Sequence, residues 1–304
     1  MPVDALAVPA ESVQVWIHEV PADAWGVAGR LQADRQEPYA ATMRVALAQI
    51  SSTADPDHNL SLVRDGIREA AAAGAALVVF PEGTMCAFGN PLGPVAEPVD
   101  GPWADAVRAA AADAGITAVV GMFTPADEGR VHNTLLATGP GVDAHYNKIH
   151  LFDAFGFAES RTVAPGAKPV AISVDGVQVG LATCYDVRFP ALFQLLAADG
   201  AQVIVLPASW GDGPGKREQW DLLVRARALD STAYVAACDQ ADPRTVGRDP
   251  GGAPSGIGAS LVAGPLGQVV IQIEREPGLV LADLDLDAVE TARRTVPVLA
   301  NRRI

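Results

Sequence analysis

The chain has 304 residues, with 36 acidic and 22 basic side chains and a formal net charge of −14 at pH 7. This charge disfavours nucleic acids as partners, because proteins bind them by neutralising phosphates with Lys and Arg, and it disfavours anionic membrane surfaces for the same reason. Hydrophobic residues make up 49% of the chain and charged residues 19%, a composition that excludes global disorder.

The three cysteines, Cys86, Cys184 and Cys238, lie far apart in the sequence. Their odd count and the absence of a Cys-x-x-Cys pair argue against a disulfide framework and a structural zinc site. The first ten residues contain no basic segment typical of export, and no apolar run approaches the ~20 residues that a membrane-spanning helix needs. The sequence therefore predicts a cytoplasmic protein with no membrane partner.

The first 42 residues are the least patterned part of the chain. They are rich in Ala, Pro and acidic residues, whereas Met43 opens the strand-like run Met-Arg-Val-Ala-Leu-Ala-Gln-Ile. We therefore expect the folded domain to span residues 43–304, and residues 1–42 to be an extension that is disordered or not native. The alternative is an N-terminal arm that packs on a neighbour through Trp16 and Trp25.

From Met43 onward, apolar runs of strand length alternate with segments of helical periodicity. Residues 75–81 form a run without polar alternation, which indicates a strand buried on both faces. The other predicted strands are 45–50, 116–123, 133–138, 177–184, 202–207, 234–238, 260–263, 268–273 and 279–284. The predicted helices are 59–73, 103–114, 191–198 and 218–231. This alternation predicts an α/β protein with layered sheets.

Residues 45–82 and 179–208 share one pattern. Each has Val-x-Leu-Ala, then a predicted helix, then Ala-x-Gly-Ala at the start of an apolar strand that ends at proline. Two related β-α-β units predict two related sheets packed face to face, with the helices outside. Open α/β sheets carry their chemistry at the carboxyl ends of strands, and Glu82 and Cys184 both lie at such ends.

Cys184 ends a predicted strand and precedes a helix that is expected to begin near Pro190. Backbone N–H groups and the positive end of a helix at such a turn favour a thiolate and can bind an oxyanion. The alternative is an ordinary buried cysteine, a common place for this residue type. The position alone supports both interpretations equally.

Glu82 and Lys148 are the other two candidates for catalysis. A carboxylate that follows an apolar strand loses contact with water, which disfavours its charged form and makes Glu82 a better proton acceptor, as suits a general base. The alternative is a helix cap or a loop carboxylate at the rim of the sheet. Lys148 lies alone among aromatic and apolar residues, where it could hold positive charge beside a developing oxyanion. The alternative is a surface lysine whose alkyl chain packs on its neighbours.

These three residues, in this order, resemble the Glu-Lys-Cys triad of the nitrilase superfamily of carbon–nitrogen hydrolases. The resemblance rests on Phe80-Pro-Glu82, Asn147-Lys-Ile-His-Leu-Phe152 and Thr183-Cys-Tyr-Asp-Val-Arg-Phe-Pro190. It extends to Leu206-Pro-Ala-Ser-Trp210 and to residues 220–230, and it covers about 43–299. The details are most similar to the omega-amidase-related branch.

The resemblance implies a four-layer αββα sandwich that forms a homodimer, and chemistry that needs no metal or cofactor. It implies that Cys184 attacks the substrate as a thiolate and that Glu82 accepts and returns protons. Lys148 and the backbone N–H of Tyr185 would hold the oxyanion. Glu159, in Ala-Glu-Ser, matches the family's second glutamate, which orients the site or relays protons.

Further residues are candidates for supporting the site or shaping its pocket. Ser209 and Trp210 are predicted to contact the substrate. His150 stands two residues after Lys148, a spacing that would place both on one face if the segment were a strand, so His150 could support the site but not act as a base. Cys86 could line the pocket, although packing is the simpler interpretation. The Gly-rich residues 248–256 are expected to form a pocket loop.

The implied reaction is hydrolysis of a small, linear amide to a carboxylic acid and ammonia. Alternatives within the class are a nitrilase, an N-carbamoyl hydrolase and a deaminated-glutathione amidase; an alternative of another class is a silent binding or scaffold protein. Arg188 is a candidate ligand for a substrate carboxylate, because guanidinium binds carboxylates in a bidentate manner. Its alternative role is structural, as a partner of Asp186 or of a backbone carbonyl.

Overall fold

The computed structural model describes residues 26–27, 30–31 and 42–303. Strands β1 (Gly26–Val27) and β2 (Arg30–Leu31) pair with each other in antiparallel orientation and belong to a unit separate from the main domain. Trp16 and Trp25 lie outside the described residues, and so does most of the predicted extension. The first strand of the main domain begins at Thr42.

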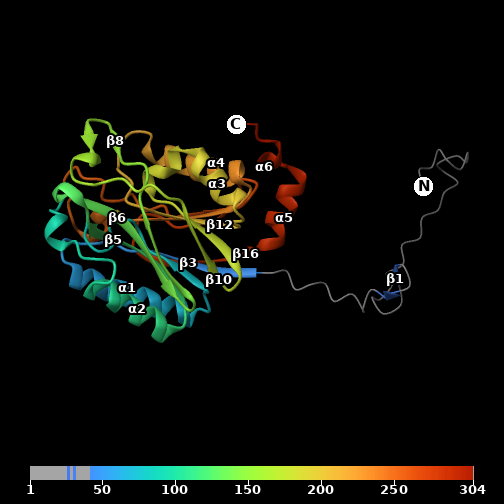
Figure 1. Cartoon of the computed structure of the whole chain (residues 1–304), viewed down its shortest axis with the longest axis horizontal. Helices are drawn as coiled ribbons and strands as arrows, with labels where there is room; N and C mark the ends of the chain where they lie inside the picture. Colours follow the sequence, from blue (N-terminus) through green and yellow to red (C-terminus); the bar gives the residue numbers. More distant parts are fainter. Residues whose placement is uncertain (1–25, 28–29, 32–41, 304) are drawn as a thin grey trace, which may run out of the picture. The chain divides into compact units, whose positions relative to one another are not determined.

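The first of two six-stranded sheets contains both the first and the last strand of the main domain (Figure 1). Its order is β16 (Gly278–Asp285), β3 (Thr42–Gln49), β4 (Leu77–Val79), β5 (Thr117–Pro125), β6 (Val131–Gly139) and β7 (Val142–Asn147). Strands β3, β4 and β5 are parallel, and the outer strands are antiparallel to their neighbours.

The second sheet follows the same plan. Its order is β10 (Val170–Val174), β11 (Val177–Leu181), β12 (Val203–Ala208), β13 (Tyr234–Asp239), β14 (Leu261–Ala263) and β15 (Val269–Gln272). Strands β11, β12 and β13 are parallel. The small hairpin of β8 (Asp153–Ala154) and β9 (Phe157–Ala158) stands apart from both sheets.

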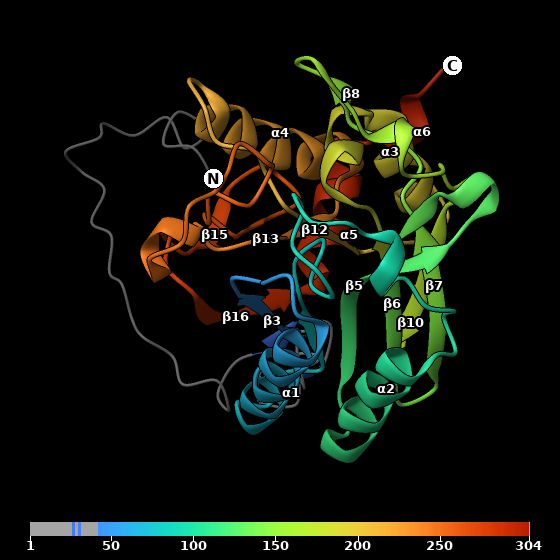
Figure 2. The same ribbon diagram turned by 90° about the vertical axis from the view of Figure 1, so that its left-hand side faces the viewer.

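Helices cover the outer faces of the two sheets, as Figures 1 and 2 show. Helices α1 (Pro56–Ala72) and α2 (Pro102–Ala114) pack on the first sheet, and α3 (Pro190–Ala198) and α4 (Lys216–Ser231) on the second. Three of these four helices start with proline, whose missing N–H costs nothing at that position. The chain continues after β16 into α5 (Leu286–Thr295) and α6 (Val298–Asn301).

Three apolar layers hold this arrangement together. The central layer joins the inner faces of both sheets, with Leu47 and Val79 from one and Val179 and Val205 from the other. The two outer layers lie between each sheet and its helices. Burial of apolar area drives this packing, and the result is the predicted four-layer αββα sandwich.

The two related units of the sequence are confirmed as parallel β-α-β units, β3-α1-β4 and β11-α3-β12. Two residue positions differ from those considered from the sequence. Strand β11 ends at Leu181, so Cys184 belongs to the following turn. Strand β7 ends at Asn147, so Lys148 and His150 lie in a loop and do not share the face of a strand.

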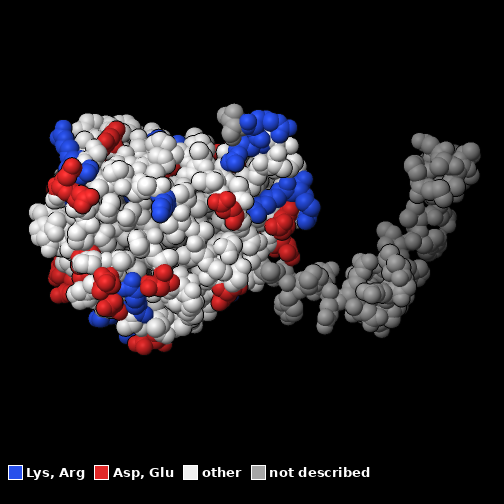
Figure 3. Space-filling view, in the orientation of Figure 1, with Lys and Arg blue, Asp and Glu red and all other residues white. Residues whose placement is uncertain are grey.

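Charged side chains are scattered over the face of the molecule seen in Figure 3, with both signs mixed and wide uncharged areas between them. Several form surface ion pairs, such as Arg44 with Asp283 at 2.7 Å and Arg108 with Asp143 at 3.0 Å. Among the described helices, none is both long and apolar enough to cross a membrane.

Candidate active site

The turn that carries Cys184 is a short 3-10 helix, Cys184–Arg188, between β11 and α3. Thr183 caps this helix, and the Asp186 side chain bonds back to the Thr183 backbone. Cys184 itself has φ of +44°, a conformation that L-residues rarely adopt and that costs on the order of 1–3 kcal/mol. The surrounding contacts must therefore hold this turn in place.

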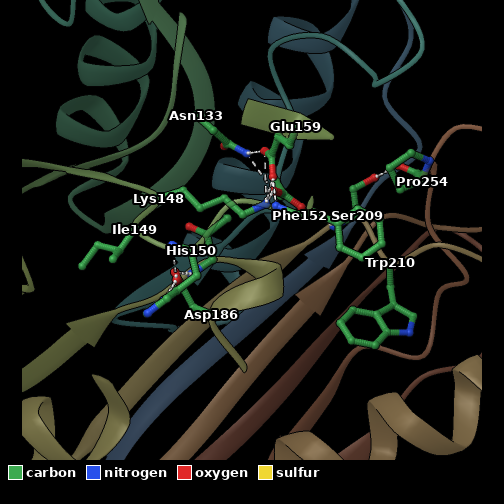
Figure 4. A network of polar contacts seen from close by, with 12 residues as sticks. Asn133, Lys148, Ile149, His150, Phe152, Glu159, Asp186, Ser209, Trp210 and Pro254 are labelled. Carbon is green, nitrogen blue, oxygen red and sulfur yellow. Dashed lines mark hydrogen bonds and ion pairs between the residues drawn. The ribbon is translucent and has the colours of Figure 1, made fainter. Parts of the chain in front are cut away.

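Asp186 supplies most of these contacts. Its buried carboxylate accepts hydrogen bonds from the Tyr146 hydroxyl at 2.7 Å, from the Thr183 N–H at 2.8 Å and from the His150 N–H at 3.0 Å. The Nδ1 atom of His150 also lies 2.7 Å from Asp186 (Figure 4). The His150 ring stacks on Phe189. His150 thus supports the nucleophile turn through Asp186.

Glu82, Lys148 and Glu159 form a buried cluster whose side chains are at most 5% exposed. The Lys148 ammonium lies 2.8 Å from Glu82 Oε1. It also lies 2.9 Å from Glu159 Oε2 (Figure 4). Burial of this depth excludes a surface lysine and a carboxylate at a solvated rim. One cation between two carboxylates leaves the three groups with a net negative charge.

Several neighbours fix the geometry of the two carboxylates. Asn133 Nδ2 donates to Glu82 at 2.7 Å and to Glu159 at 3.3 Å. The backbone N–H of Ser209 donates to Glu82 Oε2 at 3.0 Å, and that of Phe152 to Glu159 Oε2 at 2.6 Å. Charge-assisted hydrogen bonds of this kind are stronger than neutral ones, so both carboxylates are held in defined orientations.

The electrostatics of the cluster favour an ammonium on Lys148 and a thiol on Cys184. Burial opposes the charge on Lys148, but Glu82, Glu159 and Cys184 together outweigh it and raise the pKa of Lys148 well above its usual value. Burial, and then the Glu82 carboxylate, raise the pKa of Cys184, while Lys148 acts in the opposite direction. The resting nucleophile is thus a thiol beside a carboxylate that can accept its proton.

A cavity of about 440 Å³ opens beside Cys184. Glu82, Lys148 and Glu159 line it together with Tyr185, Ser209 and Trp210, so the structure brings these seven predicted site residues to one place. Much of the remaining wall is apolar: Phe88, Leu92, Val131, Phe152, Phe157 and Val163. A cavity of this size, with few polar groups in an apolar wall, suits a small organic molecule.

Arg188 occupies a different position from the one expected. It is not among the residues that line the cavity. Its Nη2 donates to Gln219 at 2.7 Å, and its guanidinium lies over the rings of Trp210 at 5.3 Å and Tyr185 at 5.8 Å. This position supports neither direct contact with substrate nor a pair with Asp186.

The remaining candidates are also placed. Cys86 and Cys238 pack in apolar clusters, so the simpler interpretation of Cys86 fits the structure. The loop 248–256 contributes Ala253 and Pro254 to the cavity wall, and the Ser209 hydroxyl donates to the Pro254 carbonyl (Figure 4). In the described part of the chain, no group of three or more His, Cys, Asp or Glu side chains is arranged to hold a metal ion.

Sequence reasoning missed two residues whose side chains form hydrogen bonds with Glu82. Asn133 stood at the start of a predicted strand, and nothing in its spacing linked it to the two glutamates. Gln240 donates to the Glu82 carbonyl at 3.0 Å from the loop after β13. Both contacts join segments far apart in the sequence, so only the tertiary structure identifies them.

Comparison with known families agrees with this geometry. The carbon–nitrogen hydrolase family matches residues 44–294. The chain belongs to this family. A hydrolase of Mycobacterium tuberculosis is 61% identical over 86% of this chain and 95% of its own length. Human omega-amidase NIT2 is 32% identical, over 86% of this chain and 95% of its own.

One solved structure similar to this chain shows a covalent adduct at its active-site cysteine. It is a glutamate-to-leucine mutant of the amidase from Nesterenkonia sp. AN1, with the acetamide moiety of fluoroacetamide added covalently at the active-site cysteine. The TM-score is 0.68 at 28% identity, over 86% of this carbon–nitrogen hydrolase and 97% of the Nesterenkonia chain. The resemblance seen in the sequence motifs is therefore confirmed at the level of family and fold.

Proposed function

We propose that this carbon–nitrogen hydrolase is an amidase that converts a small linear amide to a carboxylic acid and ammonia through a thioester on Cys184. The observation that carries the proposal is the buried Glu82–Lys148–Glu159 cluster beside Cys184 in a cavity of about 440 Å³. Relatives named as amidases, and the covalent adduct on the cysteine of the Nesterenkonia enzyme, support it.

The first half-reaction begins with proton transfer from the Cys184 thiol to Glu82. The thiolate attacks the amide carbon and forms a C–S bond, and the carbonyl oxygen becomes an oxyanion that Lys148 and the backbone N–H of Tyr185 stabilise. When the C–N bond breaks, Glu82 gives its proton to the departing nitrogen. Ammonia leaves, and the acyl group stays on sulfur.

The second half-reaction uses the same base. Glu82 takes a proton from water, and the resulting hydroxide attacks the thioester carbon. The C–S bond then breaks, the acid departs, and the proton returns to the Cys184 sulfur. Lys148 donates to Glu159 as well as to Glu82, and the role of Glu159 in the proposal is to hold the ammonium in position.

The test is ammonia release from a panel of primary amides, nitriles and N-carbamoyl compounds. The proposal expects release from amides that is lost in Cys184→Ala. Turnover confined to nitriles or carbamoyl compounds would move the enzyme to one of those alternatives within the family. A protein that turns over none of the panel and forms no adduct would be a silent binding member.

We further propose that the enzyme works as a cytoplasmic homodimer. Leucines on the outer helices support a dimer: Leu222 and Leu229 of α4 are 66% and 43% exposed, and Leu195 of α3 is 38% exposed. Leu222 and Leu229 lie about two turns apart on α4, and α3 packs beside α4. Large exposed apolar side chains on neighbouring helices favour a protein partner. Light scattering should report about twice the chain mass of 31.5 kDa, and a fully active monomer would contradict the proposal.

A further inference from the structure

Lys216, the first residue of α4, is a second lysine in the wall of the active-site cavity. The chain has three lysines, and Lys148 and Lys168 are the other two. The Lys216 ammonium lies 3.9 Å from the centre of the Phe155 ring, 5.6 Å from that of Phe152 and 5.7 Å from that of Trp210. Three aromatic rings therefore hold this cation.

The charge of Lys216 is not compensated by a carboxylate. Within the described residues, no acidic side chain forms an ion pair with it, whereas Lys148 has two such partners. Aromatic rings attract a cation, but they do not neutralise its charge and do not accept hydrogen bonds from its N–H groups as a carboxylate does. Its three N–H donors remain available to a ligand.

The surroundings of Lys216 also disfavour its charge. Burial, and then the nearby Arg188, lower the pKa of Lys216 below its usual value. An anion that binds in the cavity would offset both effects, because it supplies the opposite charge that the rings do not. The carboxylates already in the wall, Glu82 and Glu159, are committed to Lys148.

We propose that Lys216 binds a carboxylate on the substrate, at the end opposite the amide that Cys184 attacks. This inference rests on the proposed function, because it names the substrate class of the same site: linear amides that carry a second, anionic end. It transfers to Lys216 the role considered from the sequence for Arg188, which donates to Gln219 and does not line the cavity.

The aromatic rings also explain how a flexible lysine side chain can discriminate between substrates. A lysine side chain loses much rotamer freedom when it is fixed on a ligand, and here Phe152 and Trp210 restrict the ammonium before the substrate arrives. The nucleophile and the cation belong to separate elements of one cavity. The distance between them then selects the length of the substrate chain.

The experiment compares monoamides of succinic, glutaric and adipic acid with neutral amides in which an isopropyl group replaces the carboxylate. The measured quantity is the ratio of kcat/KM for the acid to that for its neutral isostere. In Lys216→Met this ratio should fall about 10- to 150-fold, the loss expected for one charge-assisted hydrogen bond. Lys216→Arg should keep most of the preference, because it retains the charge.

Lys168→Met is the matched control, because Lys168 is exposed and its loss changes the net charge equally. It should leave the ratio unchanged. An equal ratio in the wild type and Lys216→Met, or an equal fall in both lysine variants, would overturn the inference and leave the amidase proposal standing.

A binding measurement separates the inference from turnover. Calorimetry should detect binding of the dicarboxylic acid monoamides to the Cys184→Ala protein. In the double variant with Lys216→Met, this binding should be at least about tenfold weaker. Equal binding in the presence and absence of Lys216→Met would refute the carboxylate site. If the wild type releases no ammonia from any amide, the proposed function fails, while this measurement still decides the role of Lys216.

Discussion

Glu82 and Ser209 come from opposite sheets, and the backbone N–H of Ser209 donates to Glu82 Oε2 at 3.0 Å. Glu82 follows β4 and Ser209 follows β12, the closing strands of the two related β-α-β units. The contact therefore lies where the carboxyl ends of strands from both sheets meet. The geometry of the site therefore depends on how the two sheets pack on each other.

Replacement of the nucleophile tests the covalent step. Cys184→Ser should lose nearly all turnover, because a serine hydroxyl lacks the nucleophilicity of a thiolate at neutral pH. Mass spectrometry of the wild type with a slow amide should show an acyl group on the peptide that contains Cys184. An adduct on Cys86 or Cys238, which are packed in apolar clusters, would refute the assignment.

Because Glu82 acts electrostatically on Cys184, Glu82→Gln should have opposite effects on the alkylation of the thiol and on the hydrolysis of amides. The Glu82 carboxylate raises the pKa of Cys184, so Glu82→Gln should lower that pKa, while Lys148 still favours the thiolate. The pH profile of Cys184 alkylation by iodoacetamide should shift to lower pH. Amide hydrolysis should nevertheless fall steeply, because the proton acceptor is lost.

The exposed Glu69 provides a control for this experiment. Glu69→Gln should change neither the alkylation profile nor hydrolysis. If the profile of Glu82→Gln stays in place or moves to higher pH, Glu82 does not act on the thiol. If hydrolysis survives in Glu82→Gln, another group serves as the base.

Much of the fold and the triad follows from local features of the sequence. A run without polar alternation identified the buried strand β4, and the repeated β-α-β pattern identified the pair of sheets. The segment 142–147 was missed as a strand because Asp143 and His145 interrupt its apolar pattern. In the structure these two side chains alternate with the buried Val142 and Tyr146, as in a strand at the edge of a sheet.

Side-chain direction was the part that the sequence could not supply. Arg188 lies four residues after the nucleophile, and Lys216 lies much further along the chain, yet only Lys216 lines the cavity. The 3-10 turn at Cys184 directs Arg188 toward Gln219 of α4. Spacing along the chain does not reveal such a direction when the backbone leaves regular structure, as it does at the positive φ of Cys184.

The expected domain boundary can be tested by truncation. A variant that starts at Met43 should melt at the same temperature as the full chain, because strand β3 keeps its pairs with β16 from Met43 onward. A fall of several degrees, about 1 kcal/mol or more for a domain of this size, would show that the first 42 residues pack on the domain. A variant that starts at Ala46 should be destabilised, because it removes the buried Met43 and Val45.

Replacing Arg188 should lower kcat/KM equally for acidic and neutral amides, unlike the selective loss expected on replacing Lys216. Arg188→Lys loses the fork that reaches Gln219 and the flat contact with the Tyr185 and Trp210 rings. A lost hydrogen bond of this kind is worth about 0.5–1.5 kcal/mol. We therefore expect kcat/KM to fall about 2- to 12-fold, by the same factor for acidic and neutral amides.

The partner residue gives a second test of this structural role. Gln219→Leu should cause a smaller fall than Arg188→Lys, because it removes the hydrogen bond and leaves the ring contacts in place. The double variant should be no worse than Arg188→Lys alone, because that variant has already lost the hydrogen bond. A selective loss with acidic amides in Arg188→Lys would instead show that its guanidinium reaches the substrate carboxylate. In that event Arg188 would share the anionic end of the substrate with Lys216, and the rings of Tyr185 and Trp210 would have to move to admit it.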